Sequence, residues 1–252
     1  MKSSERTITV SASDVWKSIV YSIVSGQKTL DEISQQRMLA IAGDPHGTLV
    51  TAGEQSAGRG RQGRSWTAPT GRALLCSVVV RDPPRLLPLA AGVAVAEAAG
   101  EAAQIKWPND VLIAGRKVAG ILVEGRPQER WAVVGIGLNV AVRPEDFPSE
   151  LRDRATTLGL APDAIEPTLD TLLGALAHWF AAGAPEVLAA VRRRDALFGR
   201  RVRWAQGTGI ADGIDADGCL RVLTGDSATT LAAGEVHLEP TQGRGTVSTD
   251  TS

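Results

Sequence analysis

Residues 56–66 read Ser-Ala-Gly-Arg-Gly-Arg-Gln-Gly-Arg-Ser-Trp, and the rest of the 252-residue chain is organised around them. Three arginines are spaced by glycines, and no acidic residue lies between Glu54 and Asp82. Guanidinium groups stay ionised and present forked donors that suit carboxylate and phosphate oxygens. Glycine lets the backbone come close to a ligand. The stretch predicts a loop that wraps a small anionic ligand, although a solvated basic turn explains the loop alone equally well.

The composition indicates a globular protein. With 43% hydrophobic and 22% charged residues, the chain can bury a core. The net charge of −1 argues against a general nucleic-acid binder or a polybasic membrane protein. Cys76 and Cys219 are too few for a disulfide framework and lack metal-ligand spacing. No stretch is long and apolar enough to be a membrane span, so we expect no membrane partner and a cytoplasmic location.

Residues 1–197 show mixed helical and strand patterns. A capping box at Thr29-Leu30-Asp31-Glu32 predicts a helix that runs to about residue 42. An Ala- and Leu-rich run predicts a second helix over 86–103. Further helices are expected at 167–180 and 185–198, and strands at 15–23, 48–54, 73–80, 105–107, 111–113, 117–124 and 131–140.

The pattern changes after Phe198. Short strand-like pieces at 201–204, 207–214, 219–222, 229–231 and 236–238 alternate with turns. They predict a small β-barrel over 198–240, and residues 241–252 are expected to be a disordered tail.

Three more pieces carry functional groups. Lys106-Trp107-Pro108-Asn109-Asp110 ends a strand, and Lys117 lies among small and apolar residues that would aim its ammonium into a cavity. Gly135-Ile136-Gly137-Leu138-Asn139 ends a buried strand on an amide. Taken singly, each piece also has an ordinary structural explanation as a turn, an exposed lysine or a packing glycine.

Together and in this order, the four pieces resemble biotin protein ligase, the family that attaches biotin to a lysine of carboxylase carrier domains. Residues 58–66 match the family's Gly-Arg-Gly-Arg-x-Gly-Arg-x-Trp loop throughout, and 106–110, 116–124 and 135–139 match its next three blocks. The resemblance implies an α+β fold like that of the class II synthetases, with a mixed, mostly antiparallel sheet and helices in residues 1–197. It also implies that residues 198–240 form an SH3-like barrel.

The resemblance implies a two-step reaction. The biotin carboxylate attacks the α-phosphate of ATP, and the resulting biotinyl-5′-AMP is then captured by a lysine of a biotin carboxyl carrier protein, such as that of acetyl-CoA carboxylase. Lys117 and Arg61 would be the catalytic residues, with Arg59 helping to hold the anions. Mg²⁺ would bridge the phosphates, and Asp110 is the candidate metal ligand.

The resemblance also implies two sets of contacts. Those to biotin would come from Thr29, Gln55, Gly58, Arg59, Gly60, Arg61, Lys117 and Gly120. The nucleotide pocket would be lined by Arg59, Arg61, Trp66, Lys106, Asn109, Asp110, Lys117, Leu138 and Asn139, with Trp66 facing adenine. Arg64 is expected to support the loop without touching a ligand.

Two departures from the family pattern bear on these expectations. Many members carry Ser-Thr-Asn before the first helix, whereas this chain reads Lys28-Thr29-Leu30, so its biotin contacts differ. About 47 residues precede the first matched strand and look committed to the catalytic domain. We therefore expect a monofunctional ligase that does not bind DNA and works as a monomer or a homodimer.

Two rival functions remain open. A lipoate or octanoyl ligase shares the fold, but the arginine–glycine loop is typical of the biotin branch. A non-catalytic binding protein, either a nucleic-acid module or a biotin-responsive regulator, is disfavoured by the near-neutral charge and by Lys117, Asn109 and Asp110.

Overall fold

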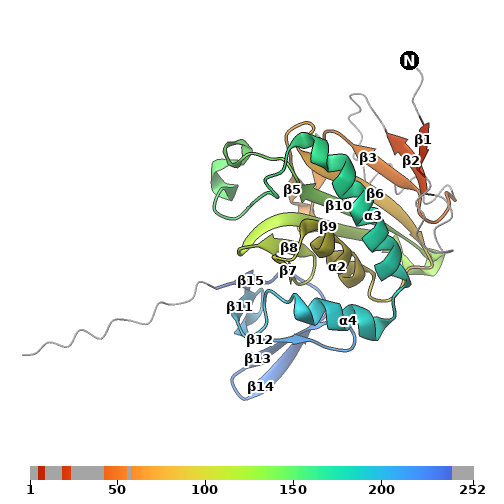
Figure 1. Cartoon of the computed structure of the whole chain (residues 1–252). Helices are drawn as coiled ribbons and strands as arrows, with labels where there is room; N and C mark the ends of the chain where they lie inside the picture. The colour runs from red at the N-terminus through yellow and green to blue at the C-terminus, as the bar shows by residue number, and fades with distance from the viewer. Residues whose placement is uncertain (1–4, 9–18, 24–42, 56–57, 240–252) are drawn as a thin grey trace, which may run out of the picture. The chain divides into compact units, whose positions relative to one another are not determined.

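The computed structural model describes residues 5–8, 19–23, 43–55 and 58–239 (Figure 1). The chain divides into two compact units, residues 1–196 and 197–252, next to the boundary expected between 197 and 198. The helix predicted from Thr29 and the tail predicted at 241–252 lie outside the described residues.

The first unit is built on an eight-stranded sheet with the order β1-β2-β3-β6-β10-β9-β8-β7. Neighbouring strands pair antiparallel except β2 and β3, which are parallel. This mixed, mostly antiparallel sheet confirms the predicted α+β class. The strands are β1 (Glu5–Ile8), β2 (Ile19–Ile23), β3 (Leu49–Ala52), β6 (Ala73–Arg81), β7 (Ala103–Lys106), β8 (Asp110–Ile113), β9 (Arg116–Arg126) and β10 (Trp131–Asn139).

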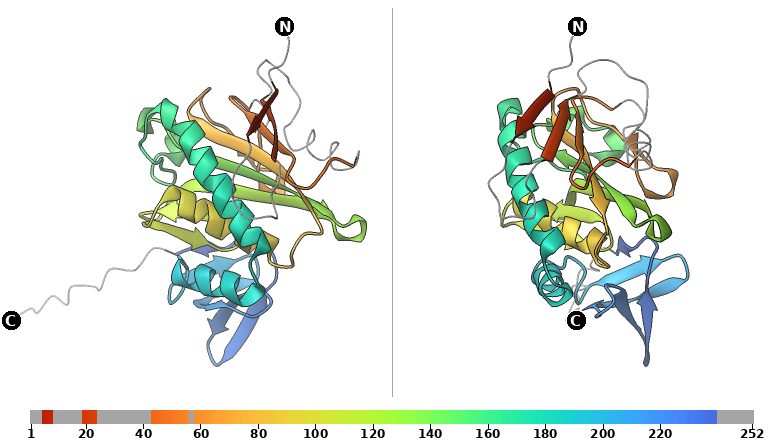
Figure 2. Two further views of the ribbon diagram at one scale, coloured as in Figure 1. Left: turned by 45° about the vertical axis from the view of Figure 1, so that its right-hand side comes forward. Right: turned by 90° about the vertical axis from the view of Figure 1, so that its right-hand side faces the viewer.

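Helices α2 (Leu87–Ala99), α3 (Ile165–Ala181) and α4 (Ala184–Arg193) lie to one side of this sheet (Figure 2). The small side chains of α2 let it approach β7, β8, β9 and β10, and α3 packs on α2 and β6. The helix predicted over 86–103 is therefore too long. Gly100, at φ 104°, ends α2 in a conformation that side-chain-bearing residues rarely adopt, and Ala103 already begins β7.

The second unit contains a five-stranded antiparallel sheet in the order β14-β13-β12-β11-β15. Its strands are β11 (Arg201–Trp204), β12 (Gly207–Ile214), β13 (Leu220–Thr224), β14 (Ser227–Leu231) and β15 (His237–Leu238), which correspond to the five predicted pieces.

The other helices among the described residues are short, of the 3₁₀ type, and belong to the first unit: η1 (Arg61–Gly63), η2 (Pro127–Glu129), η3 (Pro144–Asp146), η4 (Ser149–Leu151) and η5 (Pro162–Ala164). Within the described residues, no helix is both long and apolar enough to cross a membrane.

We expect His46 to make the first unit sensitive to acid. Its Nδ1 accepts the backbone N–H of Arg81 at 3.0 Å, and burial lowers the pKa of His46 below its ordinary value of 6.5, against the opposing charge of Asp82. The unfolded chain therefore takes up a proton first as pH falls, and stability is lost from about pH 6.5 downward until the folded imidazole also titrates.

We expect the His46→Asn variant, which keeps an acceptor near Nδ1, to lose less thermal stability than the wild type between about pH 7.5 and about pH 5.5, a range that brackets the ordinary histidine pKa. Melting temperatures at the two pH values measure the difference. Equal losses in the two proteins would show that His46 does not cause the pH dependence.

Candidate functional site

The arginine-rich stretch folds as a small hairpin. Strands β4 (Gly58–Arg59) and β5 (Ser65–Trp66) pair antiparallel around η1. Gln62 and Gly63 both have positive φ, at 57° and 73°, and the N–H of Gly60 donates to the carbonyl of Arg64 at 2.6 Å. This turn needs a residue such as glycine with access to the left-handed region. The loop therefore folds as a hairpin closed by a left-handed turn.

Trp66, at the end of the hairpin, rests on a floor made of two glycines. Gly120 of β9 and Gly137 of β10 are cross-strand partners. A Cβ added at Gly137 would lie 2.6 Å from Cε2 of Trp66, and one at Gly120 would lie 3.3 Å from Cζ3. Any side chain at Gly137 would thus displace the indole. The glycines let the aromatic ring lie directly against the sheet.

Trp66 also joins a hydrophobic cluster that sequence analysis did not foresee. It packs with Phe147 and Ala68 against the buried residues Ala73, Leu75 and Val142. Its Nε1 is buried and has no hydrogen-bond partner among the described residues. The indole ring therefore packs against apolar residues while its N–H donor has no partner among the described residues. Such a ring is suited to bind a flat polar ligand.

Lys117 reaches this floor because of a β-bulge. Asp110 pairs with Gly120 and Val111 with Ala119, but Leu112 pairs with Lys117, so Val118 is the extra residue. Side chains alternate along a strand, and an extra residue reverses the alternation. Lys117 therefore lies on the same face as Gly120 and Asp110. Without the bulge it would point to the opposite face.

A cluster of opposite charges occupies this face. The Nζ of Lys117 lies 2.6 Å from Oδ1 of Asp110 and 5.5 Å from the centre of the Trp66 ring. The Nζ of Lys106 lies 3.5 Å from Oδ2 of Asp110. Burial lowers the pKa of Lys106; the charge of Asp110 opposes this shift, and the positive charges of Lys117 and Arg64 add to it. One carboxylate thus serves two ammonium groups.

Asn109 links the hairpin to this cluster. Its Oδ1 accepts a hydrogen bond from Nη1 of Arg61 at 3.1 Å, and its Nδ2 donates to the carbonyl of Ile121 at 3.0 Å. The N–H of Ile121 donates to the carbonyl of Asn109 at 2.9 Å. The amide therefore holds the Arg61 guanidinium next to the Asp110 turn.

Residues 154–157, which we call the strap, fix the backbone of Lys117. The N–H of Lys117 donates to the carbonyl of Arg154, and the N–H of Thr156 donates to the carbonyl of Lys117, both at 2.8 Å. Nδ2 of Asn139 donates to the carbonyl of Thr156 at 2.9 Å. The hydroxyl of Thr157 is 3.2 Å from the carbonyl of Asn139. The buried Asn139 side chain thus holds the strap through this hydrogen bond. The contact with the nucleotide that was predicted for Asn139 is a separate role.

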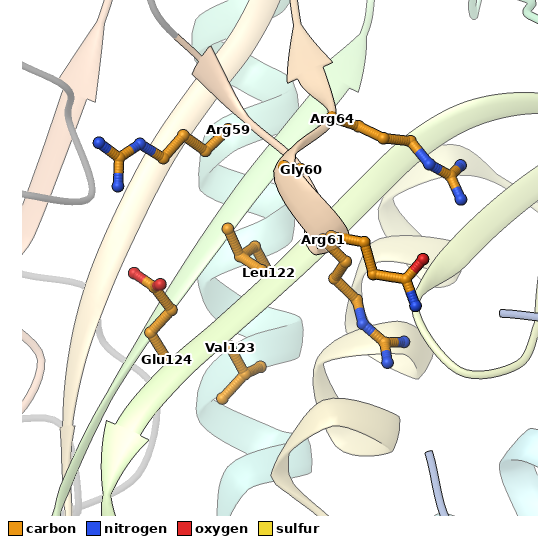
Figure 3. Close-up of a pocket in the computed structure, with 9 residues that line it drawn as sticks. Arg59, Gly60, Arg61, Arg64, Leu122, Val123 and Glu124 are labelled. Atoms are coloured by element: carbon orange, nitrogen blue, oxygen red, sulfur yellow. The ribbon is translucent and has the colours of Figure 1, made fainter. Parts of the chain in front are cut away.

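An open pocket of about 540 Å³ lies between the hairpin and β9, lined by Arg59, Gly60, Arg61, Gln62, Gly63, Arg64, Leu122, Val123 and Glu124. Figure 3 shows Arg61 and Arg64 pointing to one side of the loop and Arg59 to the other. The carboxylate of Glu124 lies on the side of Arg59. Arg59 and Arg61, which we expected to act together on the anions, therefore face different ends of the pocket.

The predicted site residues are mostly brought together. The two lysines, Asp110, Asn109, Arg61, Trp66 and Gly120 form one cluster, and Gln55 lies against Gly58, where an added Cβ would be 2.5 Å from its Oε1. Leu138 is different, because its side chain is fully buried on the face opposite Gly137. It can line the site through its backbone alone. Thr29 lies outside the described residues.

A protein-built magnesium site does not fit these residues. Among the described residues, no three His, Cys, Asp or Glu side chains form a group that could hold a metal. Both oxygens of Asp110, the predicted metal ligand, are paired with lysines. Mg²⁺ would have to be held mainly by the phosphates of a nucleotide.

Comparison with known proteins identifies relatives of this chain. Residues 30–140 match the model of the biotin/lipoate A/B protein ligase family. The biotin--[acetyl-CoA-carboxylase] ligase of Mycobacterium tuberculosis is 32% identical over 251 residues, covering 91% of this chain and 92% of that protein. The bifunctional ligase/repressor BirA of Bacillus subtilis is 44% identical over 149 residues, which are 54% of this chain. That match spans 44% of BirA, so the chain corresponds to less than half of it.

The fold is also found among solved structures. The biotin protein ligase of Aquifex aeolicus in complex with biotin and ATP superposes with a TM-score of 0.68 at 28% identity, covering 82% of this chain and 94% of that chain. A point mutant of the same enzyme in complex with biotin gives a TM-score of 0.70 at 26% identity, covering 88% of this chain and 98% of that chain.

Proposed function

Because this chain belongs to the biotin/lipoate A/B protein ligase family, we propose that it activates biotin with ATP and transfers it to a lysine of a carrier protein. The observation that carries the proposal is the cluster of Lys117, Arg61 and Asp110 beside the aromatic floor of Trp66. It combines cations for a carboxylate and a phosphate with an apolar, flat surface for a ring.

In the first step, an oxygen of the biotin carboxylate attacks the α-phosphorus of ATP, the bond from that phosphorus to the α–β bridging oxygen breaks, and pyrophosphate leaves. Two anions must be brought together, so fixed positive groups are needed where negative charge develops. Lys117 is held by its backbone and lies over the glycine floor, and Arg61 is held by Asn109. We assign both to the phosphorus under attack and to the attacking carboxylate. Both are pre-organised, which reduces the reorganisation needed during the reaction.

The nucleoside is assigned to the hydrophobic cluster. Trp66 and Phe147 offer aromatic faces, and offset stacking on such faces is worth about 0.5–1.5 kcal/mol for an aromatic pair. The buried Nε1 of Trp66 supplies a donor for a polar group of the ligand. Any Mg²⁺ would arrive on the phosphates of ATP, since Asp110 pairs with both lysines.

In the second step, the amine of the acceptor lysine attacks the carbonyl of biotinyl-AMP and AMP leaves. The mixed anhydride hydrolyses in water, so the hairpin over the pocket would protect it until the acceptor arrives. We propose a biotin carboxyl carrier domain as the acceptor and the cytoplasm as the compartment. Cys76 and Cys219 are both thiols, which suits that reducing compartment.

The test is incubation of the protein with ATP and biotin, or with ATP and lipoate, followed by mass analysis and a pyrophosphate assay. Biotin-dependent pyrophosphate release, with a mass of biotinyl-AMP and a labelled carrier domain, is the expected result. Activity with lipoate alone would assign the chain to the lipoate branch. Binding of biotin without pyrophosphate release would identify a non-catalytic protein.

The hydroxyl of Thr157 in the strap leads to a prediction for the ligase activity. The Thr157→Val variant loses the hydroxyl that hydrogen-bonds to the carbonyls of Asn139 and Val140 and accepts the N–H of Gly159. Loss of such a bond costs about 1 kcal/mol, so we expect kcat for adenylate formation to fall about fivefold while KM for biotin changes little. Thr157→Ser should restore kcat. A fall in Thr157→Ser equal to that in Thr157→Val would contradict this role.

A further inference from the structure

Resting on the proposed ligase activity, we propose that Arg194 is a positioning residue for the nucleotide, which acts through β7 and Lys106. Arg194 belongs to residues 194–196, which we call the clasp and which directly follow helix α4. Its role is to hold the strand that ends in Lys106, and it does not itself touch the ligand.

The clasp covers the outer edge of β7. That strand is the last in the order of the first sheet, and β8 is its neighbour on the inner side. The N–H of Ile105 donates to the carbonyl of Arg194 at 2.7 Å, and the N–H of Ala196 donates to the carbonyl of Ile105 at 2.9 Å. Ile105 and Asp195 thereby form a parallel bridge. The clasp thus satisfies the backbone groups of Ile105 that point away from β8, which protects an edge strand against fraying.

The side chain of Arg194 holds the turn that leads into β7. Its Nη1 donates to three backbone carbonyls, at 2.9 Å to Ala103, 3.2 Å to Gly100 and 3.4 Å to Glu101. A cation is favourable there, because these carbonyls lie at and beyond the C-terminal end of α2, which carries partial negative charge. Arg194 therefore fixes the first residue of β7 through its side chain and the third through its main chain.

The residue that the clasp holds directly precedes Lys106. Neighbouring side chains of a strand point to opposite faces. The side chain of Ile105 lies toward α2, where a Cβ added at Gly92 would be 3.6 Å from its Cγ2. Lys106 therefore points to the other face, where its Nζ lies 3.5 Å from Oδ2 of Asp110. A shift of β7 would move this ammonium, whereas Lys117 would stay in place because the strap holds its backbone.

The two ligands should therefore respond differently to the loss of Arg194. Lys106 is expected to contact the nucleotide and is not among the residues expected to contact biotin. The described residues of that second set lie between Gln55 and Arg61 and on β9, outside the strand that the clasp holds. A selective loss of nucleotide affinity would distinguish positioning through β7 from a general loss of stability.

The test is a double-mutant cycle in the full chain with Arg194→Met and Lys106→Met. Binding of an ATP analogue with a non-cleavable α–β bridge is measured by calorimetry with biotin present, and binding of biotin is measured separately. We expect Arg194→Met to raise the Kd of the analogue about fivefold and to leave the Kd of biotin within about twofold of wild type. In the Lys106→Met background, the same substitution should change the Kd of the analogue by less than about twofold, because its effect passes through the Lys106 side chain.

Arg193→Met is the matched control, because Arg193 is an exposed arginine one position earlier, on α4. It should bind both ligands as the wild type does. An unchanged Kd of the analogue in Arg194→Met, an equal loss of biotin binding, or the same loss in both backgrounds would overturn the proposal. If Arg194→Met does not fold, Arg194→Lys takes its place in the cycle, since it keeps a cation but loses the planar fork of donors. Failure of the wild type to form biotinyl-AMP would instead reject the proposed function, and the Kd values of the analogue would still decide the role of Arg194.

Discussion

The Lys117→Ala variant is expected to form biotinyl-AMP about 100- to 1,000-fold more slowly than the wild type. This is the effect of removing one pre-organised group from a site where charge develops. Among the described residues, Lys106 and Arg61 are poorly placed to replace the ammonium, because Lys106 pairs with the other oxygen of Asp110 and Arg61 is held by Asn109. Single-turnover formation of the adenylate measures the loss directly.

An alanine substitution one position earlier, at Arg116, is the control that separates an effect on the reaction from an effect on folding. Arg116→Ala removes an exposed cation from the same strand and should leave the rate within about twofold of wild type. Lys117→Ala should keep its melting temperature within a few degrees, because its backbone bonds to Arg154 and Thr156 do not involve the side chain. A normal adenylation rate in Lys117→Ala would remove this lysine from the reaction.

The second large effect is expected from Gly137→Ala, which is an addition of one methyl group. That carbon would lie 2.6 Å from the Trp66 ring, closer than non-bonded atoms approach, so the indole must move off the floor. Overpacking of this kind costs about 1–3 kcal/mol. We expect lower stability together with a loss of about tenfold or more in affinity for a non-hydrolysable biotinyl-AMP analogue.

Gly174→Ala is its control. This glycine lies within α3, and an added Cβ there meets nothing within 4 Å. Alanine is the better helix former by about 0.8–1.0 kcal/mol, so stability should rise and ligand affinity should not change. If Gly137→Ala bound the analogue normally, the glycine floor would not be what positions Trp66 for the ligand.

Much of the fold could be predicted because each element follows local rules. The apolar run of β6 is buried on both faces, as expected for a central strand, and the five strands of the second unit follow its turn signals. The end of α2 was misplaced because Ala-rich sequence continues past Gly100 and local propensity does not show where β7 begins. Pairing with β8 decides that boundary.

The candidate site was less open to prediction, since much of it depends on contacts between distant segments. The lysines, Asn109 and the hairpin could be named from their chemistry. Phe147 and Thr157 could not, because they are ordinary residues in an irregular segment until the chain brings them to Trp66 and Asn139. The directions of the arginine side chains could not be predicted either. The sequence suggested that Arg59 and Arg61 act together, whereas their side chains point to opposite sides of the loop (Figure 3).

The bulge at Val118 has a consequence for how this active region tolerates change during evolution. On a regular strand, two residues share a face when their separation is even, yet Lys117 and Gly120 share one at a separation of three. At this spacing the bulge is thus as necessary as the lysine itself for placing the ammonium on the face of Gly120. A regular strand of the same length would preserve every functional residue and still turn the ammonium away from Asp110. Substitutions at Val118 that keep the bulge leave Lys117 in place, whereas those that straighten β9 without changing its length do not.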